Sequence, residues 1–246
     1  MKKILSMLLV LCMALTLCSA AFAEGKSPVD GMTVAFIPKV SGNSFFEAAN
    51  DGAQKYAADW GLTVDYIGAP TADVTTQLEL IQQAIDKGVD AICISSVDAT
   101  GLDEKLQEAQ DAGIYVSTWD SDVSPNARAL MVSQGTADVL GPMLVDMAVD
   151  SLTERGVDVN GEVKYVWHFS NPSVSDQNSW YVAGDKYIKE KYPSWVAVHD
   201  PYYSNQDPAQ SVSVGESILD AYADVDVIIC NDSTALPGQC KAAENK

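Results

Sequence analysis

The sequence predicts an α/β protein of two lobes, each built on a parallel sheet that helices cover on both faces. Short apolar segments rich in β-branched residues alternate with amphipathic segments of helical period along most of the chain. Such alternation is typical of parallel sheets. In addition, a helix–strand unit at residues 73–96 has a counterpart at residues 207–233. This internal repeat indicates that a similar α/β unit occurs in each lobe.

The first lobe is expected to contain four strands and three helices. The strands are expected where apolar and β-branched residues follow one another, at residues 32–37, 62–67, 91–95 and 114–118. The helices are expected where apolar residues recur every three or four positions, at residues 44–60, 74–87 and 102–112. The right-handed crossover rule then orders these units around one sheet.

The second lobe repeats the pattern with strands at residues 163–169 and 225–230 and helices at residues 137–152, 176–191 and 209–222. The segment 120–136, which contains Pro125 and Gly135, is the expected first crossing between the lobes. We therefore expect the first lobe at residues 24–124 and the second at residues 125–246. Residues 234–246 are typical of a helix that leads into a further strand, so the second lobe is expected to be incomplete at its C-terminus.

The first 23 residues are typical of a secretory signal peptide. Lys2 and Lys3 precede an apolar segment at residues 4–17, and small residues at Ala21 and Ala23 suit a cleavage site. The apolar segment is too short to span a membrane. A lipid attachment site at Cys12 or Cys18 is disfavoured, because Leu precedes each of them. We expect an exported protein, located in the periplasm or outside the cell.

Charge and cysteine content exclude several classes of function. Without residues 1–23 the chain has 13 basic and 34 acidic residues, a net charge of −21, which argues against nucleic acid and anionic membranes as partners. Three cysteines remain, Cys93, Cys230 and Cys240, so they cannot form a complete set of disulfides. His168 and His199 have no neighbours at the spacing of metal ligands. We expect neither a metal nor another cofactor.

Polar and aromatic side chains cluster after the predicted strands, where ligands of open α/β sheets bind. Carboxylates accept hydrogen bonds from hydroxyl groups, amides donate and accept them, and aromatic faces cover the C–H groups of a sugar ring. The cluster therefore suits a small polyhydroxylated ligand. Its members are Lys39, Phe45, Phe46, Trp119, Asp120, Asp176, Gln177, Asn231, Asp232 and Ser233.

Several of these side chains also have a purely structural interpretation. Asn43, Asp98 and Ser175 suit helix caps as well as ligand contacts. Trp119 and one of the two adjacent phenylalanines suit the core. Lys39 and Asp120 are harder to explain in this way, because a charge directly after a buried strand costs free energy unless it has a partner.

Signals of catalysis are weak. The sequence contains no glycine-rich phosphate loop, no nucleophile elbow and no HExxH. Asp120 and Asp122 are conceivable as an acid–base pair, but acids beside a tryptophan suit sugar binding equally well. We therefore expect a binding protein, and an exported sugar-active enzyme remains the alternative of another class.

The chain resembles the type I periplasmic sugar-binding proteins, and among them the autoinducer-2-binding proteins of ABC importers. The resemblance rests on AFIPK with GNSFFEAANDGAQ, on TWDSD, on SQGT with LGPMLVDMA, on NPSVSDQNSW, and on IICNDSTALP with AAEN. It implies two Rossmann-like lobes joined by a hinge, with the ligand bound between them. Members of the family continue past the residue that corresponds to Lys246.

The resemblance implies side-chain contacts to the ligand from Lys39, Asp120, Asp176 and Gln177. It also implies mainly backbone contacts from the turn at Asn231 and Ser233, where the family has Pro and Ala. The function that follows is a solute-binding protein, expected to be monomeric, that delivers autoinducer-2 or a similar cyclic polyol to the permease of an ABC importer. A rhamnose- or ribose-type monosaccharide is the alternative ligand, and a role in chemosensing is open as well.

Overall fold

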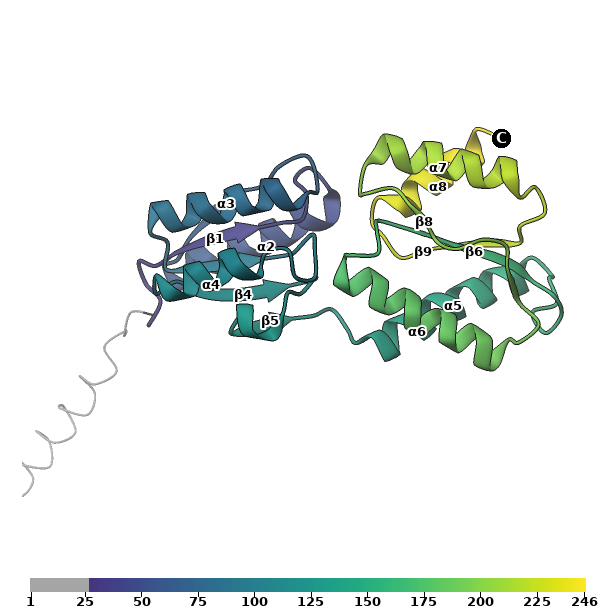
Figure 1. Ribbon diagram of the computed structural model, residues 1–246, viewed down its shortest axis with the longest axis horizontal. Helices are drawn as coiled ribbons and strands as arrows, with labels where there is room; N and C mark the ends of the chain where they lie inside the picture. The colour runs from purple at the N-terminus through teal and green to yellow at the C-terminus, as the bar shows by residue number, and fades with distance from the viewer. Residues whose placement is uncertain (1–26) are drawn as a thin grey trace, which may run out of the picture.

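Two parallel sheets, one in each lobe, organise the computed structural model, which describes residues 27–246 (Figure 1). The predicted signal peptide lies outside the described residues. Within residues 27–246 no helix is long and apolar enough to cross a membrane.

The first lobe has a five-stranded sheet in the order β2-β1-β3-β4-β5, with all pairs parallel. Three helices and a short 3₁₀ turn connect the strands. Asn43 precedes α2 and caps it: its side chain accepts a hydrogen bond from the backbone N–H of Phe45, so this predicted cap is confirmed. The elements are β1 (Thr33–Ile37), α2 (Ser44–Trp60), β2 (Thr63–Tyr66), α3 (Val74–Lys87), β3 (Ala91–Ile94), α4 (Asp103–Asp111), β4 (Tyr115–Trp119), the turn Pro125–Ala127 and β5 (Leu130–Val132).

Alternation along the strands divides the core of the first lobe between the two faces of its sheet. Ala35 and Ile37 of β1 pack with buried residues of α3 and α4, whereas Phe36 packs with Phe46 of α2 and with Trp119. The sheet is thus covered on both faces, as the continuous apolar strands predict.

The second lobe has β6 at the centre of its sheet. β6 pairs in parallel with β7 and β8, and it also pairs with β9. Helices α5 and α6 pack together on one side of this sheet, and α7 and α8 pack together on the other (Figure 1). The elements are α5 (Ala137–Glu154), β6 (Lys164–Phe169), α6 (Ser175–Lys191), β7 (Val196–Ala197), β8 (Tyr202–Tyr203), α7 (Pro208–Ala221), β9 (Val227–Cys230) and α8 (Ala235–Glu244).

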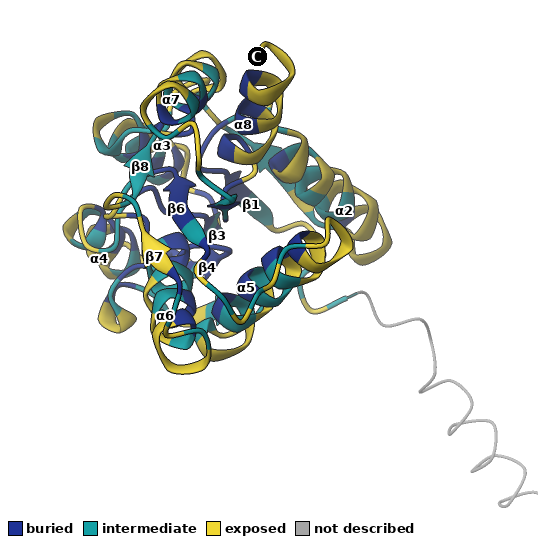
Figure 2. Cartoon of the chain, turned by 90° about the vertical axis from the view of Figure 1, so that its right-hand side faces the viewer, coloured by how far each residue is buried: buried dark blue, intermediate teal, exposed yellow. Residues whose placement is uncertain are grey.

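Figure 2 shows buried strands at the centre and exposed surface on the outer sides of the surrounding helices. In the second lobe, Tyr165, Trp167 and Phe169 of β6 pack with buried residues of α5 and α6. The α5 and α6 helices approach closely at Gly141 and Gly184, where a Cβ on Gly141 would lie 2.6 Å from the backbone N of Gly184. Glycine is therefore required at this crossing.

The division between the lobes falls later than predicted. β5 pairs with β4, so residues 130–132 belong to the first sheet although they follow the expected boundary at residues 124 and 125. This strand has only three residues, and two of its apolar side chains are exposed. Such a short segment shows no periodicity from which a strand can be predicted. We place the division between β5 and α5, at residues 133–136.

Candidate functional site

A buried lysine lies between two acids where the carboxyl ends of the two sheets meet. Lys39 follows β1, Asp120 follows β4, and Asp176 lies in the first turn of α6. Lys39 Nζ lies 3.0 Å from Asp120 Oδ2 and 3.2 Å from each carboxylate oxygen of Asp176. Lys39 is only 2% exposed. The three predicted charged residues are thus brought together, and Lys39 links the lobes.

Polar neighbours hold the two carboxylates in place. Ser95 Oγ donates a hydrogen bond of 2.7 Å to Asp120 Oδ2, and Gln134 Nε2 donates one of 2.8 Å to Asp120 Oδ1. Ser121 Oγ donates to Asp176 Oδ1. Asp120 also has a left-handed backbone, with φ of 61°, which Asp and Asn tolerate better than most residues. Contacts within the protein therefore orient both carboxylates.

Burial and neighbouring charges shift the pKa values of Lys39, Asp120 and Asp176 in different directions. Burial lowers the pKa of Lys39, but the negative charges of Asp176 and Asp120 outweigh burial and raise this pKa above its ordinary value. Burial raises the pKa of Asp120, whereas Lys39, Ser95 and Gln134 lower it, and the net direction is downward. The pKa of Asp176 is raised, mainly by burial. Asp176 is thus the acid that takes up a proton first.

Gln177 is oriented by its own hydrogen bonds. Its Oε1 accepts the backbone N–H of Ser170 at 3.1 Å, and its Nε2 donates to Asp232 Oδ2 at 2.7 Å. Asp232 Oδ1 in turn accepts the backbone N–H groups of Thr234 and Ala235 at 3.0 and 2.7 Å. Asp232 therefore fixes the start of α8 and the side chain of Gln177 at once.

These groups surround a cavity of about 80 Å³ between the lobes, which we call the inner cavity. The two predicted phenylalanines both line it, although Phe45 is 41% exposed and Phe46 is buried and also packs in the core of the first lobe. The inner cavity is lined by Lys39, Phe45, Phe46, Asp120, Gln134, Asp176, Gln177, Trp180, Gln206, Asn231 and Ser233.

Two of the predicted site residues do not line the inner cavity. The ring of Trp119 stacks on Phe36 at a centroid distance of 4.7 Å and belongs to the core of the first lobe. The carboxylate of Asp232 is occupied by the start of α8 and by two glutamine amides. Both residues therefore support the site from behind its wall.

The structure adds residues that the strand-end pattern missed. Gln134 follows β5 and Gln206 follows β8, and neither of these short strands is detectable in the sequence. Trp180, which belongs to the same sequence cluster as Asp176 and Gln177, lies one helical turn after Asp176 on α6. Gln134 and Trp180 stand within quoted motifs of the resemblance, SQGT and NPSVSDQNSW, whereas no sequence signal locates Gln206.

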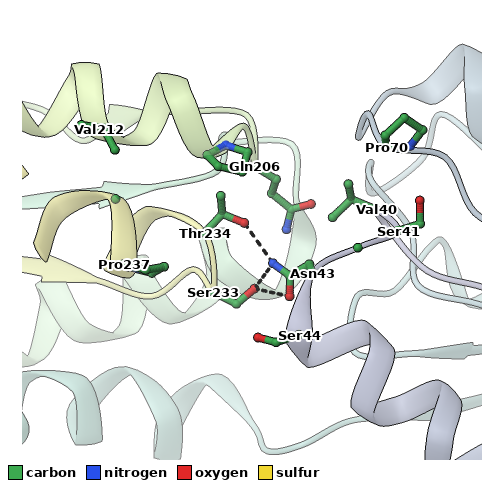
Figure 3. Close-up of a pocket in the computed structure, with 13 residues that line it drawn as sticks. Val40, Ser41, Asn43, Ser44, Pro70, Gln206, Val212, Ser233, Thr234 and Pro237 are labelled. Carbon is green, nitrogen blue, oxygen red and sulfur yellow. Dashed lines mark hydrogen bonds between the residues drawn. The ribbon is translucent and has the colours of Figure 1, made fainter. Parts of the chain in front are cut away.

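A second and larger cavity, the outer cavity, lies beside the first and has a volume of about 470 Å³ (Figure 3). Asn43 of the first lobe donates hydrogen bonds of 3.1 Å to Ser233 Oγ and Thr234 Oγ1 of the second lobe. Gln206 and Ser233 line both cavities. The two cavities therefore share a polar wall.

Asp122, the other acid that follows β4, has partners of its own. The carboxylate of Asp122 is held by Arg128 at 3.0 and 2.7 Å and by Thr118 at 2.6 Å. The carboxylate of Asp120 is held by other residues, Lys39, Ser95 and Gln134. Among residues 27–246, no three His, Cys, Asp or Glu side chains are grouped as metal ligands. The carboxylates, the lysine and the amides at the wall of the inner cavity can accept and donate hydrogen bonds.

Comparison with solved structures shows strong similarity to binding proteins. LsrB from Clostridium saccharobutylicum in complex with AI-2 is 59% identical, with a TM-score of 0.86 over 87% of this chain and 66% of that chain. A solute-binding protein from Burkholderia graminis in complex with D-arabinose is 27% identical, with a TM-score of 0.75 over 88% and 71%.

A curated relative, the D-ribose/D-allose-binding protein of Pseudomonas aeruginosa, is 28% identical over 132 residues. The match covers 51% of this chain and 41% of the relative, so the chain spans less than half the length of that protein. The relatives named here are all binding proteins for small solutes.

The periplasmic binding protein domain family matches residues 34–246, which include both sheets apart from Thr33 and all the residues that line the inner cavity. The lobed fold and the site between the carboxyl ends of the sheets agree with this match. The chain therefore belongs to the periplasmic binding protein domain family.

Proposed function

We propose that the chain is the solute-binding protein of an ABC importer and that it binds autoinducer-2, a small cyclic polyol, between its lobes. The observation that carries this proposal is the buried lysine shared by two acids from different lobes at the wall of the inner cavity. The 59% identity to LsrB, which was solved with AI-2, supports this ligand.

The lining of the inner cavity suits hydroxyl groups. Asp120 and Asp176 accept hydrogen bonds and Lys39 donates them, and a hydrogen bond to a charged group contributes about 1.5–3 kcal/mol. Phe45 and Trp180 offer apolar faces to the C–H groups of a ring. Each lobe supplies part of the contacts, so ligand binding would favour the closed arrangement of the lobes.

A monosaccharide is the second candidate ligand. Asn231 and Ser233 add an amide and a hydroxyl group to the wall, where the resemblance leads us to expect apolar residues. The amide oxygen of Asn231 has no hydrogen-bond partner among residues 27–246, so it is suited to accept one from an additional sugar hydroxyl. The relative from Burkholderia graminis was solved with D-arabinose.

Export and delivery to a permease belong to the same proposal. The predicted signal peptide would place the protein outside the cytoplasm, where the importer collects its solute. We propose no catalytic role, because reversible binding accounts for every group at the wall of the inner cavity.

A titration of the chain with autoinducer-2, D-ribose, D-arabinose and L-rhamnose tests the function. A ligand at about 100 times its Kd is expected to stabilise the fold by about 2.7 kcal/mol, which appears as a higher unfolding temperature. A shift with autoinducer-2 alone supports the proposed ligand, whereas a shift with a sugar alone moves the proposal to that sugar. Absence of any shift, or chemical conversion of the bound solute, contradicts the proposal.

A further inference from the structure

Gln206 is a buried amide at the junction of the inner and outer cavities. It follows β8 and precedes α7, and it is 4% exposed. Gln206 and its neighbour Asn205 both have left-handed backbones, with φ of 57° and 50°. In Figure 3 the side chain of Gln206 extends from the second lobe toward Val40 of the first. The backbone thus holds this side chain between the lobes.

The orientation of the Gln206 amide follows from its neighbour. Its Nε2 lies 3.2 Å from Asp232 Oδ2, and an ionised carboxylate only accepts hydrogen bonds. The nitrogen must therefore face Asp232, and the oxygen must face away from it. Gln206 Oε1 receives no hydrogen bond from any residue in the described part of the chain.

A buried acceptor without a donor is unfavourable, so its retention calls for a functional explanation. Resting on the proposed function, we infer that Gln206 is a ligand-binding residue whose Oε1 accepts a hydrogen bond from a ligand hydroxyl group. Because Gln206 lines both cavities, this hydroxyl lies on the side of the ligand that faces the outer cavity. This hydrogen bond would give Gln206 Oε1 the donor that the described part of the chain does not supply.

This contact makes the site selective for a particular kind of polyol. A ligand with a hydroxyl group at this position pairs with Gln206, whereas an analogue with hydrogen or methyl there leaves Oε1 unpaired. Sites built to bind a hydroxyl group discriminate against analogues that lack it. The preferred ligands are therefore polyols whose ring or side chain presents a hydroxyl toward the outer cavity.

Calorimetric titration of variants with a set of deoxy analogues tests the inference. The ligand is the tightest binder among autoinducer-2, D-ribose, D-arabinose and L-rhamnose, used with each analogue that lacks one of its hydroxyl groups. Gln206→Met removes the amide, and Gln206→Lys removes the acceptor but keeps a donor for Asp232. The matched control is Gln210→Met, the same substitution at an exposed position nearby.

In the unsubstituted chain, loss of one particular hydroxyl is expected to weaken binding about 5- to 10-fold. In both Gln206 variants, the ligand and the analogue that lacks this hydroxyl are expected to bind about equally well. The weakening caused by loss of any other hydroxyl group is expected to be the same as in the unsubstituted chain. The control is expected to match the unsubstituted chain throughout.

A purely structural role for Gln206 predicts that its substitution changes the affinity for the ligand and for all analogues equally. If the Gln206 variants bind the ligand and every analogue more weakly by the same factor, or bind all of them as before, the inference is wrong although the proposed function stands. If the unsubstituted chain binds none of the four solutes, the proposed function fails, and the inference fails with it.

Discussion

At the scale of single residues, the charge of Lys39 is shared between two carboxylates that come from different lobes. Removing a buried charge from water is costly, so each member of the group depends on the others. Asp120 has Ser95 and Gln134 as further donors, whereas Asp176 has Ser121. A ligand hydroxyl that binds here therefore meets groups whose positions are already fixed.

Asp176→Asn is expected to weaken ligand binding about 10- to 100-fold while the lobes remain folded. The substitution preserves the shape of the side chain and removes the charge, and a hydrogen bond to a charged group is stronger than one to a neutral amide. Calorimetric titration and urea unfolding measure the two effects. Asp150→Asn on the exposed face of α5 is the matched control, and equal affinity in both variants would contradict the assignment of Asp176.

Binding is expected to weaken as the pH falls from neutral into the acidic range. The pKa of Asp176 is raised above 3.8 by burial, so this acid loses its charge at a higher pH than Asp120, whose pKa is lowered. Titrations across this range should show the loss in the unsubstituted chain, and Asp176→Asn should flatten it. An equal loss in both would assign the pH dependence to other groups.

The same two acids make the free energy of unfolding change with pH in opposite directions. For Asp120, the stabilisation is present above its ordinary pKa of 3.8 and is lost as the pH falls through its lowered folded-state pKa. For Asp176, the folded chain binds the proton more tightly than the unfolded chain does. Its contribution to the free energy of unfolding therefore decreases as the pH rises through the interval above 3.8.

At the scale of elements, the packing of α5 against α6 places the acid of the site. Asp176 and Gln177 lie in the first turn of α6, and the helix is held against α5 by the contact between Gly141 and Gly184. A side chain at this contact would push the helices apart and displace the first turn of α6.

Gly141→Ala is therefore expected to lower the free energy of unfolding by about 1–3 kcal/mol. Its Cβ would lie 2.6 Å from the backbone N of Gly184 and 2.7 Å from the backbone O of Trp180. Gly52→Ala in α2 is the control, because a Cβ there meets nothing within 4 Å, and it is expected to stabilise the helix by up to about 1 kcal/mol. Urea unfolding of both variants checks the difference, and a neutral Gly141→Ala would contradict the close packing.

The long elements could be predicted from the sequence, and the short ones could not. Helices α2 and α3 begin and end at the predicted residues, since their apolar periodicity extends over several turns. β7 and β8 have two residues each and β5 has three, too few for any period to show. Lys39 and Asp120 follow longer strands, so the sequence predicts them as site residues. Gln206 follows β8, and the sequence does not predict it because β8 itself is too short to recognise.

At the scale of the whole molecule, contacts besides those of Lys39 join the lobes. Asn43 of the first lobe donates a hydrogen bond to Ser233 of the second. The hydroxyl group of Ser175 accepts from the backbone N–H of Asp122 and donates to its carbonyl, both at 3.0 Å. The arrangement of the lobes therefore depends on polar contacts, which solvent conditions can weaken.

Lys39→Met is expected to open the lobes in the absence of ligand. Without the lysine, the carboxylates of Asp120 and Asp176 repel each other across the gap between the lobes. Small-angle X-ray scattering should show a larger radius of gyration than for the unsubstituted chain, and mild acid should reduce the difference. Lys55→Met on the exposed face of α2 is the control, and identical scattering from both variants would rule out this role of Lys39.

The separation of the site residues along the chain has a consequence for how the protein is made. Lys39 and Asp176 are 137 positions apart, whereas every strand of the first sheet lies within residues 33–132. Domains generally fold as units, so the first lobe can reach its native contacts while the ribosome has yet to add Asp176. The site is then the last part to assemble, and a substitution of Asp176 should leave the folding of the first lobe unchanged.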